Sequence, residues 1–535
     1  MSDQTGQQVY HIHPLGWEND PDEERYRLSP LDYVGTCVFN NYALYFKLDD
    51  GDKANALEVL RSGLERTLCQ TRHLSSTIEE GPDGDHWFVR RKENTVELRV
   101  QWLDTLEDED KYPSLQDMED AHFRAQVLGD LDLWQIPQMR YGGDNPEAHP
   151  DRRPSVLGFK ASFVRGGLVL VTHVHHLAND TTGWASFIQQ LAENCRASVT
   201  GTPYPPWDPA CLVVARRLAK GPVPEDQKIT APSSLLNDPT SPLPLPGGRQ
   251  ALLFHLPKSK AAQLKALAHP PPSASSRSST TTPITNPTNN TTTTTTPPTP
   301  TPPKISTYDA TTALLWQILT RLRHAHYASR IPRSARPLWA TVIDMRQRLR
   351  LRTDLDLVGV PPSPTIPARM QRNLLSAAVS RLPLPGVPEE DVWPLHRVAA
   401  WVRAMTEAGG TWAVLEALHD QFRLLRDKTR AAADMYNLPA LAVAVSDHRA
   451  AAAVIGGGRE GEGAEFGFGK PVAYRQLWGR VDVGLLILYP ARAGSGEDEG
   501  LEFTIGYEKV LAKELVEDEE FRRWFEYRGV DWEDE

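Results

Sequence analysis

Regularly spaced apolar residues mark the folded parts of this chain. Residues 54–69 carry leucines at helical spacing, and residues 38–46 (VFNNYALYF) are typical of a strand. Residues 156–164 and 168–176 are also strand-like, and the tight turn between them predicts a hairpin. The pattern over 180–197 changes to helical spacing, which predicts an amphipathic helix directly after the hairpin.

The second half of the chain mixes both patterns. A capping box at Ser306–Asp309 predicts the start of a helix that continues to Arg323. Strands are expected at 339–343, 440–446, 483–490 and 500–507, and helices within 389–431 and over 512–527. Strands and helices do not alternate strictly, so the fold class predicted is a mixed α/β (α+β) fold rather than a doubly wound sheet.

Two segments interrupt this pattern and suggest a division into domains. A length of 535 residues is too great for one compact core. Residues 201–248 are rich in proline, and residues 269–304 form a Thr/Pro tract that cannot bury a core. We expect an N-terminal domain at 1–215, a crossover linker at 216–248 and a C-terminal domain at 249–535.

Composition excludes several classes of partner. The net charge is −11 and there is no dominant basic cluster, which argues against nucleic acid or a membrane surface. The four cysteines form no CxxC pair and indicate free thiols in a reducing compartment. The polar, acidic N-terminus lacks the pattern of a signal peptide, and no apolar run reaches membrane-spanning length. We expect a cytoplasmic protein, and a monomer.

Histidines gather where the second strand of the hairpin ends. In THVHHLAND, alternation places His176 on the buried face at the point where the chain turns. An imidazole held there by the backbone can aim one nitrogen into a cleft, as a general base must. Asp180 lies at the start of the next helix, where it can cap the helix or pair with a cation. The same residues also fit a satisfied interior histidine beside an N-cap aspartate.

Other kinds of chemistry lack the residues they need. A dinuclear metal site would need HxHxDH, but Leu177 and Ala178 follow His176, so we expect no metal. No GxSxG elbow supplies a nucleophile, which favours direct transfer to an acceptor that the histidine deprotonates. The glycine-rich run 456–463 lacks GK[ST] and carries two acids, so it is interpreted as a surface loop.

Five segments together resemble one known family. Residues 175–180 (HHLAND) resemble the HHxxxD motif of BAHD acyltransferases and of the fungal trichothecene 3-O-acetyltransferase-like proteins. Residues 465–471 (EFGFGKP) are similar to the DFGWGKP segment of that family. Weaker likenesses lie at 29–32 (SPLD), 306–323 and 344–348 (DMRQR), the last accompanied by Asn373.

This resemblance implies two domains of the chloramphenicol acetyltransferase type, with a channel between them and His176 at its middle. Acyl-CoA, most simply acetyl-CoA, would enter as a co-substrate, and a hydroxyl or amine of a small secondary metabolite would accept the acyl group. No cofactor would be bound permanently. Asp180 would pair with Arg346 or Arg348. The residues implied on the cofactor side are Phe466, Gly467, Phe468, Gly469 and Ser446.

Three departures from the family pattern bear on the cofactor side. Glu465 replaces the usual aspartate, Phe468 replaces tryptophan and so lacks an indole N–H, and Thr181 replaces a frequent glycine. Two other functions stay open at this point. One is a condensation-type domain that uses a carrier-bound acyl group, and the other is a non-catalytic protein that binds a small molecule.

Overall fold

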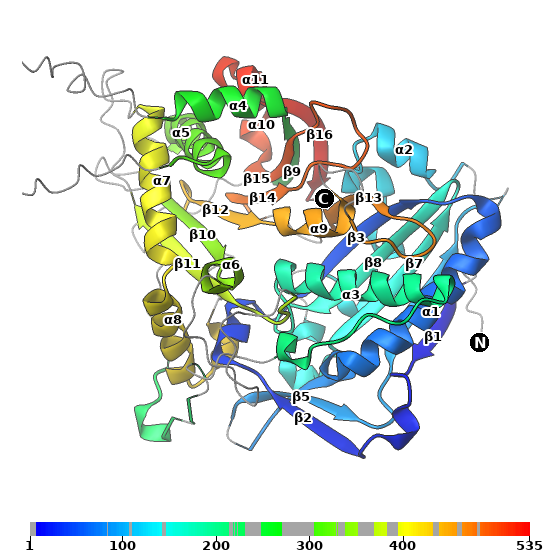
Figure 1. Cartoon of the computed structure of the whole chain (residues 1–535). Helices are drawn as coiled ribbons and strands as arrows, with labels where there is room; N and C mark the ends of the chain where they lie inside the picture. Colours follow the sequence, from blue (N-terminus) through cyan, green and yellow to red (C-terminus); the bar gives the residue numbers. More distant parts are fainter. Residues whose placement is uncertain are drawn as a thin grey trace, which may run out of the picture.

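The computed structural model contains two large β-sheets with helices packed against them (Figure 1). Most of the linker 216–248, nearly all of the Thr/Pro tract 269–304 and most of the glycine-rich run 456–463 lie outside the described residues. The described residues are 7–82, 84–105, 107, 110–141, 146–212, 218, 220–221, 223–230, 248–269, 304–327, 329, 337–350, 369–381, 394–431, 438–456, 463–478 and 482–534.

The first sheet has six strands in the order β1-β6-β7-β8-β3-β13. Only β6 and β7 run parallel. The predicted hairpin is present as β7 and β8, and His176 is the first residue after β8. The strand bounds are β1 Gln8–Ile12, β3 Phe39–Lys47, β6 Val96–Trp102, β7 Leu157–Val164, β8 Gly167–His175 and β13 Pro471–Gln476.

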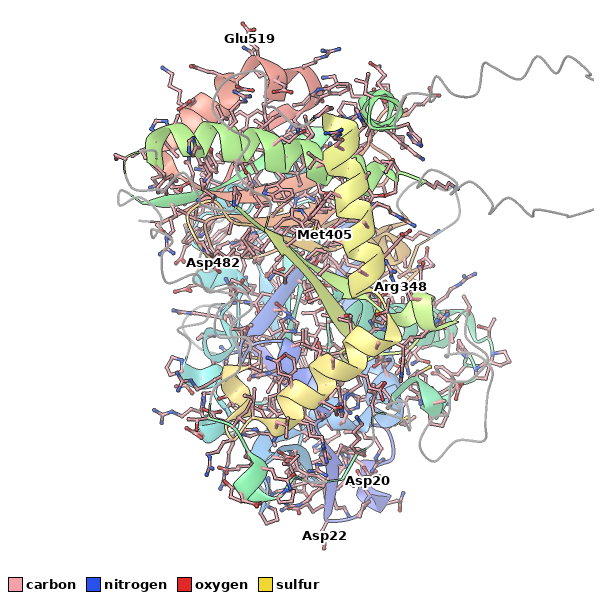
Figure 2. The ribbon with its side chains drawn as sticks, turned by 90° about the vertical axis from the view of Figure 1, so that its left-hand side faces the viewer. Asp20, Asp22, Arg348, Met405, Asp482 and Glu519 are labelled. Atoms are coloured by element: carbon pink, nitrogen blue, oxygen red, sulfur yellow. The ribbon has the colours of Figure 1, made fainter. Side chains whose placement is uncertain are left out.

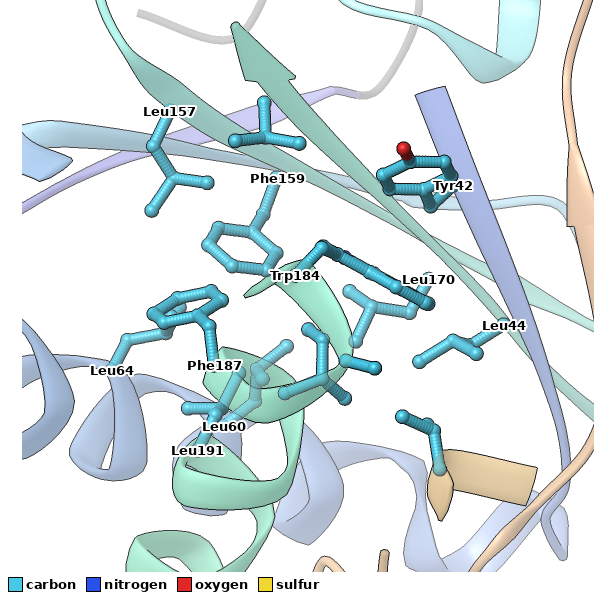
Figure 3. Packing of buried hydrophobic residues seen from close by; sticks show 14 of the residues in the cluster. Tyr42, Leu44, Leu60, Leu64, Leu157, Phe159, Leu170, Trp184, Phe187 and Leu191 are labelled. Carbon is cyan, nitrogen blue, oxygen red and sulfur yellow. The ribbon is translucent and has the colours of Figure 1, made fainter. Parts of the chain in front are cut away.

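Two long helices cover one face of this sheet, α1 (Lys53–Gln70) and α3 (Thr181–Thr200) (Figure 1). Figure 3 shows Trp184, Phe187 and Leu191 of α3 directed toward the strands and toward α1. These three side chains are at most 1% exposed. Burial of each apolar side chain contributes about 1.5–3 kcal/mol. The helical spacing that predicted α3 is therefore the spacing of its core face.

The second sheet has seven strands in the order β11-β10-β12-β14-β15-β9-β16. Strands β10, β12 and β14 run parallel to one another, and the remaining neighbours are antiparallel. The bounds are β9 Arg249–Leu256, β10 Leu338–Asp344, β11 Leu375–Arg381, β12 Val443–Asp447, β14 Leu485–Tyr489, β15 Leu501–Glu508 and β16 Glu526–Glu533.

Most helices of the second half pack around this sheet and share its apolar core. They are α4 Lys258–Leu267, α5 Thr307–Tyr327, α6 Arg346–Arg350, α7 Leu395–Gly409, α8 Trp412–Leu424, α10 Lys509–Glu517 and α11 Glu519–Trp524. The buried residues of the short helix α9 Ala452–Ile455 instead belong to the core of the first half. Within the described residues, every helix is too short or too polar to cross a bilayer. The remaining elements are α2 Leu115–Asp120 and a small sheet of β2 Glu23–Arg27, β4 Thr77–Glu80 and β5 His86–Arg91.

The end of the chain differs from the single closing helix predicted over 512–527. Helix α10 stops at Glu517, and Asp518 takes an extended conformation. The Asp518 side chain then accepts a hydrogen bond from the amide of Phe521 at 2.9 Å, which starts α11 as a new helix. After α11 the chain forms β16, which pairs with β9 at the sheet edge. Apolar spacing alone did not show this N-cap.

Strand β13 comes from the second half of the chain but belongs to the first sheet, where it pairs antiparallel with β3. Chain order and sheet membership therefore differ at this strand. The domain bounds 1–215 and 249–535 stay a prediction.

A buried group of charges joins β13 to the second sheet. The guanidinium of Arg475 donates to Glu502 of β15 at 2.7 Å, and the two side chains are 1% and 0% exposed. Arg528 and Arg492 also lie beside Glu502. Burial alone would raise the pKa of Glu502, but these three guanidinium groups together lower it.

Replacing Arg475 with Met should destabilise the protein by on the order of 2–3 kcal/mol. A broken buried ion pair typically costs ~3–5 kcal/mol, and Arg528 remains to offset part of the charge on Glu502. The matched control is Lys513→Met, because the Lys513 side chain is 84% exposed. Urea unfolding compares the two, and equal midpoints would show that the buried pair carries no stability.

Candidate active site

His176 lies at the border between the two halves of the molecule. Its backbone N–H donates to the carbonyl of Val38 at 2.8 Å, which continues the pairing of β8 with β3 for one residue. The imidazole is half-buried and lines a cavity of about 680 Å³. Tyr42 and Thr181 line this cavity from the first half, and Thr341 from the second. The side chain is therefore at a cavity and not sealed in the interior.

The backbone of Gly35 packs directly against the His176 ring. A Cβ at Gly35 would lie 2.3 Å from Nδ1 of His176, so only glycine leaves room for the ring. Nδ1 is enclosed on this side. Burial lowers the pKa of His176 below its ordinary value, while its own carbonyl group and the charge of Asp180 partly oppose the shift. The ring is thus held neutral, as a base must be before it accepts a proton.

Asp180 has both carboxylate oxygens satisfied. One accepts from the amide of Gly183 at 2.7 Å and forms the N-cap of α3. The other accepts from Arg346 at 3.0 Å and from the amide of Leu374 at 2.9 Å. The side chains of Asp180 and Arg346 are 3% and 2% exposed. Burial would lower the pKa of Arg346, but Asp180 and Asp344 raise it.

Of the two arginines expected as partners of Asp180, Arg346 makes the ion pair. Its remaining donors bind carbonyl groups of residues 369–374, with Nε 2.8 Å from Met370 and Nη2 2.7 Å from Arg372. Figure 2 shows Arg348 at the lower end of α7, where its Nη1 is 3.4 Å from the carbonyl of Gly410. One arginine thus ties Asp180 to a loop of the second half.

That loop also holds the backbone around His176. Asn373 donates from Nδ2 to the carbonyl of His176 at 2.9 Å, and the amide of Arg372 donates to Asn179 at 2.7 Å. The guanidinium of Arg372 pairs with Asp32, whose other contacts are the amide of Ser29 and Asn373. The sequence motifs marked residues 29–32 and Asn373, but they gave no indication that Asp32 binds Arg372 and Asn373.

The other two histidines of the motif have both ring nitrogens occupied. His175 donates from Nε2 to the carbonyl of Ala148 at 2.8 Å and accepts at Nδ1 from the amide of Leu177. In His173 the roles are reversed: Nε2 accepts from the amide of Ile136, and Nδ1 donates to the side-chain oxygen of Asn41. Burial lowers the pKa of His173 to about 3 and that of His175 to about 4. Within the described ranges, no three His, Cys, Asp or Glu side chains gather as metal ligands would.

The segment 466–469 does not reach the cavity that His176 lines. Phe466 is buried in the core of the first half, and Phe468 borders a separate surface groove. Glu465 accepts from the amides of Gly467 and Gly469 at 2.9 and 3.2 Å and closes a tight turn, in which Gly467 has a φ of 87°. A longer acid in place of aspartate therefore still binds this turn.

Ser446, in contrast, lines the same cavity as His176, at the second-half wall. Its hydroxyl lies 3.0 Å from Nε2 of His448, a residue that the sequence analysis did not single out. His448 also lines the cavity, and it is 4% exposed. No sequence motif marks His448, and its second partner, Tyr474, lies on a strand of the other sheet.

The sequence of this chain is similar to a known family and to a known acetyltransferase. A family model described as the trichothecene 3-O-acetyltransferase-like N-terminal domain matches residues 38–195. Acetyltransferase FGR3 of Gibberella zeae is 44% identical over 532 residues, which cover 98% of this chain and 95% of that protein. The chain belongs to the trichothecene 3-O-acetyltransferase-like acyltransferases. The family and the enzyme class expected from the motifs are thereby confirmed.

Solved structures of this acyltransferase fold match as well. TRI101 of F. graminearum, complexed with coenzyme A and T-2 mycotoxin, has a TM-score of 0.67 at 17% identity and covers 95% of this chain and 100% of that one. Vinorine synthase has a TM-score of 0.60 at 15% identity and covers 95% of each chain. The predicted mixed α/β fold with two acyltransferase-type domains is confirmed.

Asp180→Asn should lower both the melting temperature and the transfer rate of the acyltransferase. Asparagine is as good an N-cap as aspartate, so α3 can keep its cap. The change removes the charge opposite Arg346, and it replaces one of two accepting oxygens by an NH2 group, so Arg346 and the amide of Leu374 lose their acceptor. The expected loss is on the order of 3 kcal/mol, at the lower end for a broken buried pair because Asp344 remains beside Arg346. Asp344→Asn is the control, since that carboxylate is 29% exposed and its loss should cost much less. Equal melting temperatures for both variants would contradict the assignment.

Gly35→Ala should reduce kcat/KM about 100-fold, because the new Cβ displaces the His176 ring and small misplacements of reacting groups are costly. The φ of −72° at Gly35 suits alanine, so the effect is not backbone strain. Gly51→Ala is the control, since a Cβ there meets nothing within 4 Å. If Gly35→Ala transfers acyl groups at the wild-type rate, the ring is not held by this contact.

Proposed function

We propose that this acyltransferase moves an acetyl group from acetyl-CoA to a hydroxyl or amine of a small-molecule acceptor, with His176 as the general base. The observation that carries the proposal is the placement of a half-buried imidazole at a cavity lined by both halves of the chain. Similar structures hold coenzyme A together with T-2 mycotoxin or deoxynivalenol, which supports a CoA donor and a small-molecule acceptor.

The proposed reaction begins when His176 deprotonates the acceptor. The acceptor O–H gives its proton to the free nitrogen of His176 as its oxygen attacks the thioester carbon. The new C–O bond forms, and the carbonyl π electrons move to oxygen. Collapse of this oxyanion breaks the C–S bond, and the thiolate of CoA takes the proton from the imidazolium. His176 therefore ends the cycle neutral, and acetyl-CoA is a co-substrate rather than a resident cofactor.

Asp180 has a positioning role in this proposal. Both of its carboxylate oxygens accept hydrogen bonds from protein groups, and the bonds to Arg346 and Leu374 fix the turn that carries His176. The proposal also assigns Ser446 to the donor side, and Ser446 lines the cavity from the second half. The residues 466–469 stay a predicted cofactor-side segment, which would act by shaping the fold. A cytoplasmic location is part of the proposal, and the four free cysteines fit a reducing compartment. The proposal also includes a monomeric state.

His176→Ala should lower kcat by about 10²–10⁴-fold while CoA binding and the melting temperature stay near wild type. In the wild-type enzyme, the acidic fall of kcat/KM should come at a lower pH than the ordinary histidine pKa of about 6.5 would give, since burial lowers the pKa of His176 and keeps the base neutral. Stopped assays of thiol release across pH measure both effects. A near wild-type rate for His176→Ala would remove this residue from catalysis.

The acceptor can be found by product profiling. Acetyl-CoA is incubated with a cell extract, and separately with deoxynivalenol, using wild type and His176→Ala in parallel. New acetylated products that require His176 identify the acceptor. A carrier-bound acetyl donor serves as the comparison for acetyl-CoA, and faster transfer from the carrier would argue against CoA as the natural donor.

A further inference from the structure

Three side chains of the second half form a hydrogen-bonded chain that ends at the cavity. Tyr474 of β13 has its hydroxyl 2.8 Å from Nδ1 of His448. On the other side of that ring, Nε2 is 3.0 Å from the hydroxyl of Ser446, the residue before the last of β12. Tyr474 is fully buried, His448 nearly so, and Ser446 is half-buried at the cavity. This series of hydrogen bonds thus runs from the core to the cavity that His176 also lines.

Burial fixes the direction of the donors in this chain. Tyr474 belongs to an aromatic cluster with Tyr42, Trp184 and Tyr489. Among the described residues, the hydroxyl of Tyr474 is hydrogen-bonded to Nδ1 of His448. A buried O–H that donates to nothing is costly, so Tyr474 donates and Nδ1 accepts. The neutral ring then carries its proton on Nε2 and donates it to Ser446.

The state of His448 agrees with this direction. Its side chain is 4% exposed, and burial lowers its pKa to about 3. The charge of Asp447 opposes that shift, and a proton on His176 would add to it, so the two rings are within electrostatic reach of each other. The carboxylate of Asp447 is itself bound by Arg449 at 2.6 Å. His448 therefore stays neutral and keeps one donor and one acceptor.

Resting on the function proposed above, we infer that Tyr474 and His448 orient Ser446 so that its O–H points into the cavity as a donor to the thioester oxygen. A serine that already accepts from Nε2 has its own proton left for another acceptor. The strongest acceptor in the reaction is the oxyanion formed when the C–O bond is made. Ser446 would lower the energy of that state, and Tyr474 and His448 are positioning residues that act through it.

The Ser446 hydroxyl stabilises the oxyanion without adding electrons or transferring a proton. The thioester π electrons move to oxygen as the acceptor attacks, and the Ser446 O–H binds that oxygen without transferring its proton. When the C–S bond breaks, the electrons return to the carbonyl and the hydrogen bond weakens. The proton that reaches the thiolate is the one held by His176.

The test measures thiol release from acetyl-CoA with water as acceptor, so that it does not depend on the acceptor's identity. Ser446→Ala should lower kcat about 100-fold with little change in KM for acetyl-CoA. Ser446→Thr, which keeps the hydroxyl, should restore most of the rate. Tyr474→Phe and His448→Phe should each lower kcat about tenfold. Tyr489→Phe is the control, because Tyr489 contacts the same rings and its hydroxyl has no bond to the chain.

A double-mutant cycle separates an oriented donor from a merely packed one. In the Ser446→Ala background, Tyr474→Phe should have no further effect on kcat, since the donor it orients is gone. A full tenfold loss in that background, or wild-type kcat for Ser446→Ala, would overturn the inference. Melting temperatures identify variants that fail to fold. If Ser446→Ala is one of them, wild-type kcat for both Tyr474→Phe and His448→Phe would overturn the inference. Wild-type thiol release by His176→Ala would instead contradict the proposed function.

Discussion

The arrangement of this active site depends on the ion pair between Asp180 and Arg346. Both groups are almost fully removed from water, and a charge in that position is tolerated only when its hydrogen-bonding capacity is filled. Asp180 meets the condition with the helix amide of Gly183, the guanidinium of Arg346 and the amide of Leu374. Because the contacts come from both halves of the chain, neither half can shift without leaving a buried charge unpaired.

The constraint acts on the backbone and leaves the imidazole of His176 free to react. Asn373 donates to the backbone carbonyl of His176, and the His176 amide donates to the carbonyl of Val38 next to β3. The backbone of Gly35 packs against one side of the ring. His173 and His175, which look equivalent in the sequence, have both nitrogens committed to such contacts and serve to fix the strand. The chemical difference among three nearby histidines is therefore a difference in which ring nitrogens the fold leaves unbound.

Local features of the sequence were enough to predict the hairpin, α3 and the motif that they carry, since apolar period and turn residues act over short distances. The closing helix failed at Asp518, where a side-chain cap outweighed apolar spacing. Gly35 and His448 were missed because Gly35 contacts His176 and His448 contacts Tyr474, and both partners are distant in sequence. The partner of Asp180 was narrowed to two arginines by resemblance, and only the fold distinguishes Arg346 from Arg348.

Strand β13 lies in the second half of the sequence but pairs with β3 in the first sheet, and it thereby links the two halves of the molecule. This strand completes the first sheet, yet Arg475 on one of its faces binds the buried Glu502 of the second sheet. Its neighbour Tyr474 points to the opposite face, as alternation in a strand requires, and there meets His448 beside the cavity. One strand thus carries an ion pair that fixes the orientation of the halves and a phenol that reaches the cavity wall. A change in how the halves dock would be felt at both places, so stability and positioning are coupled through adjacent residues.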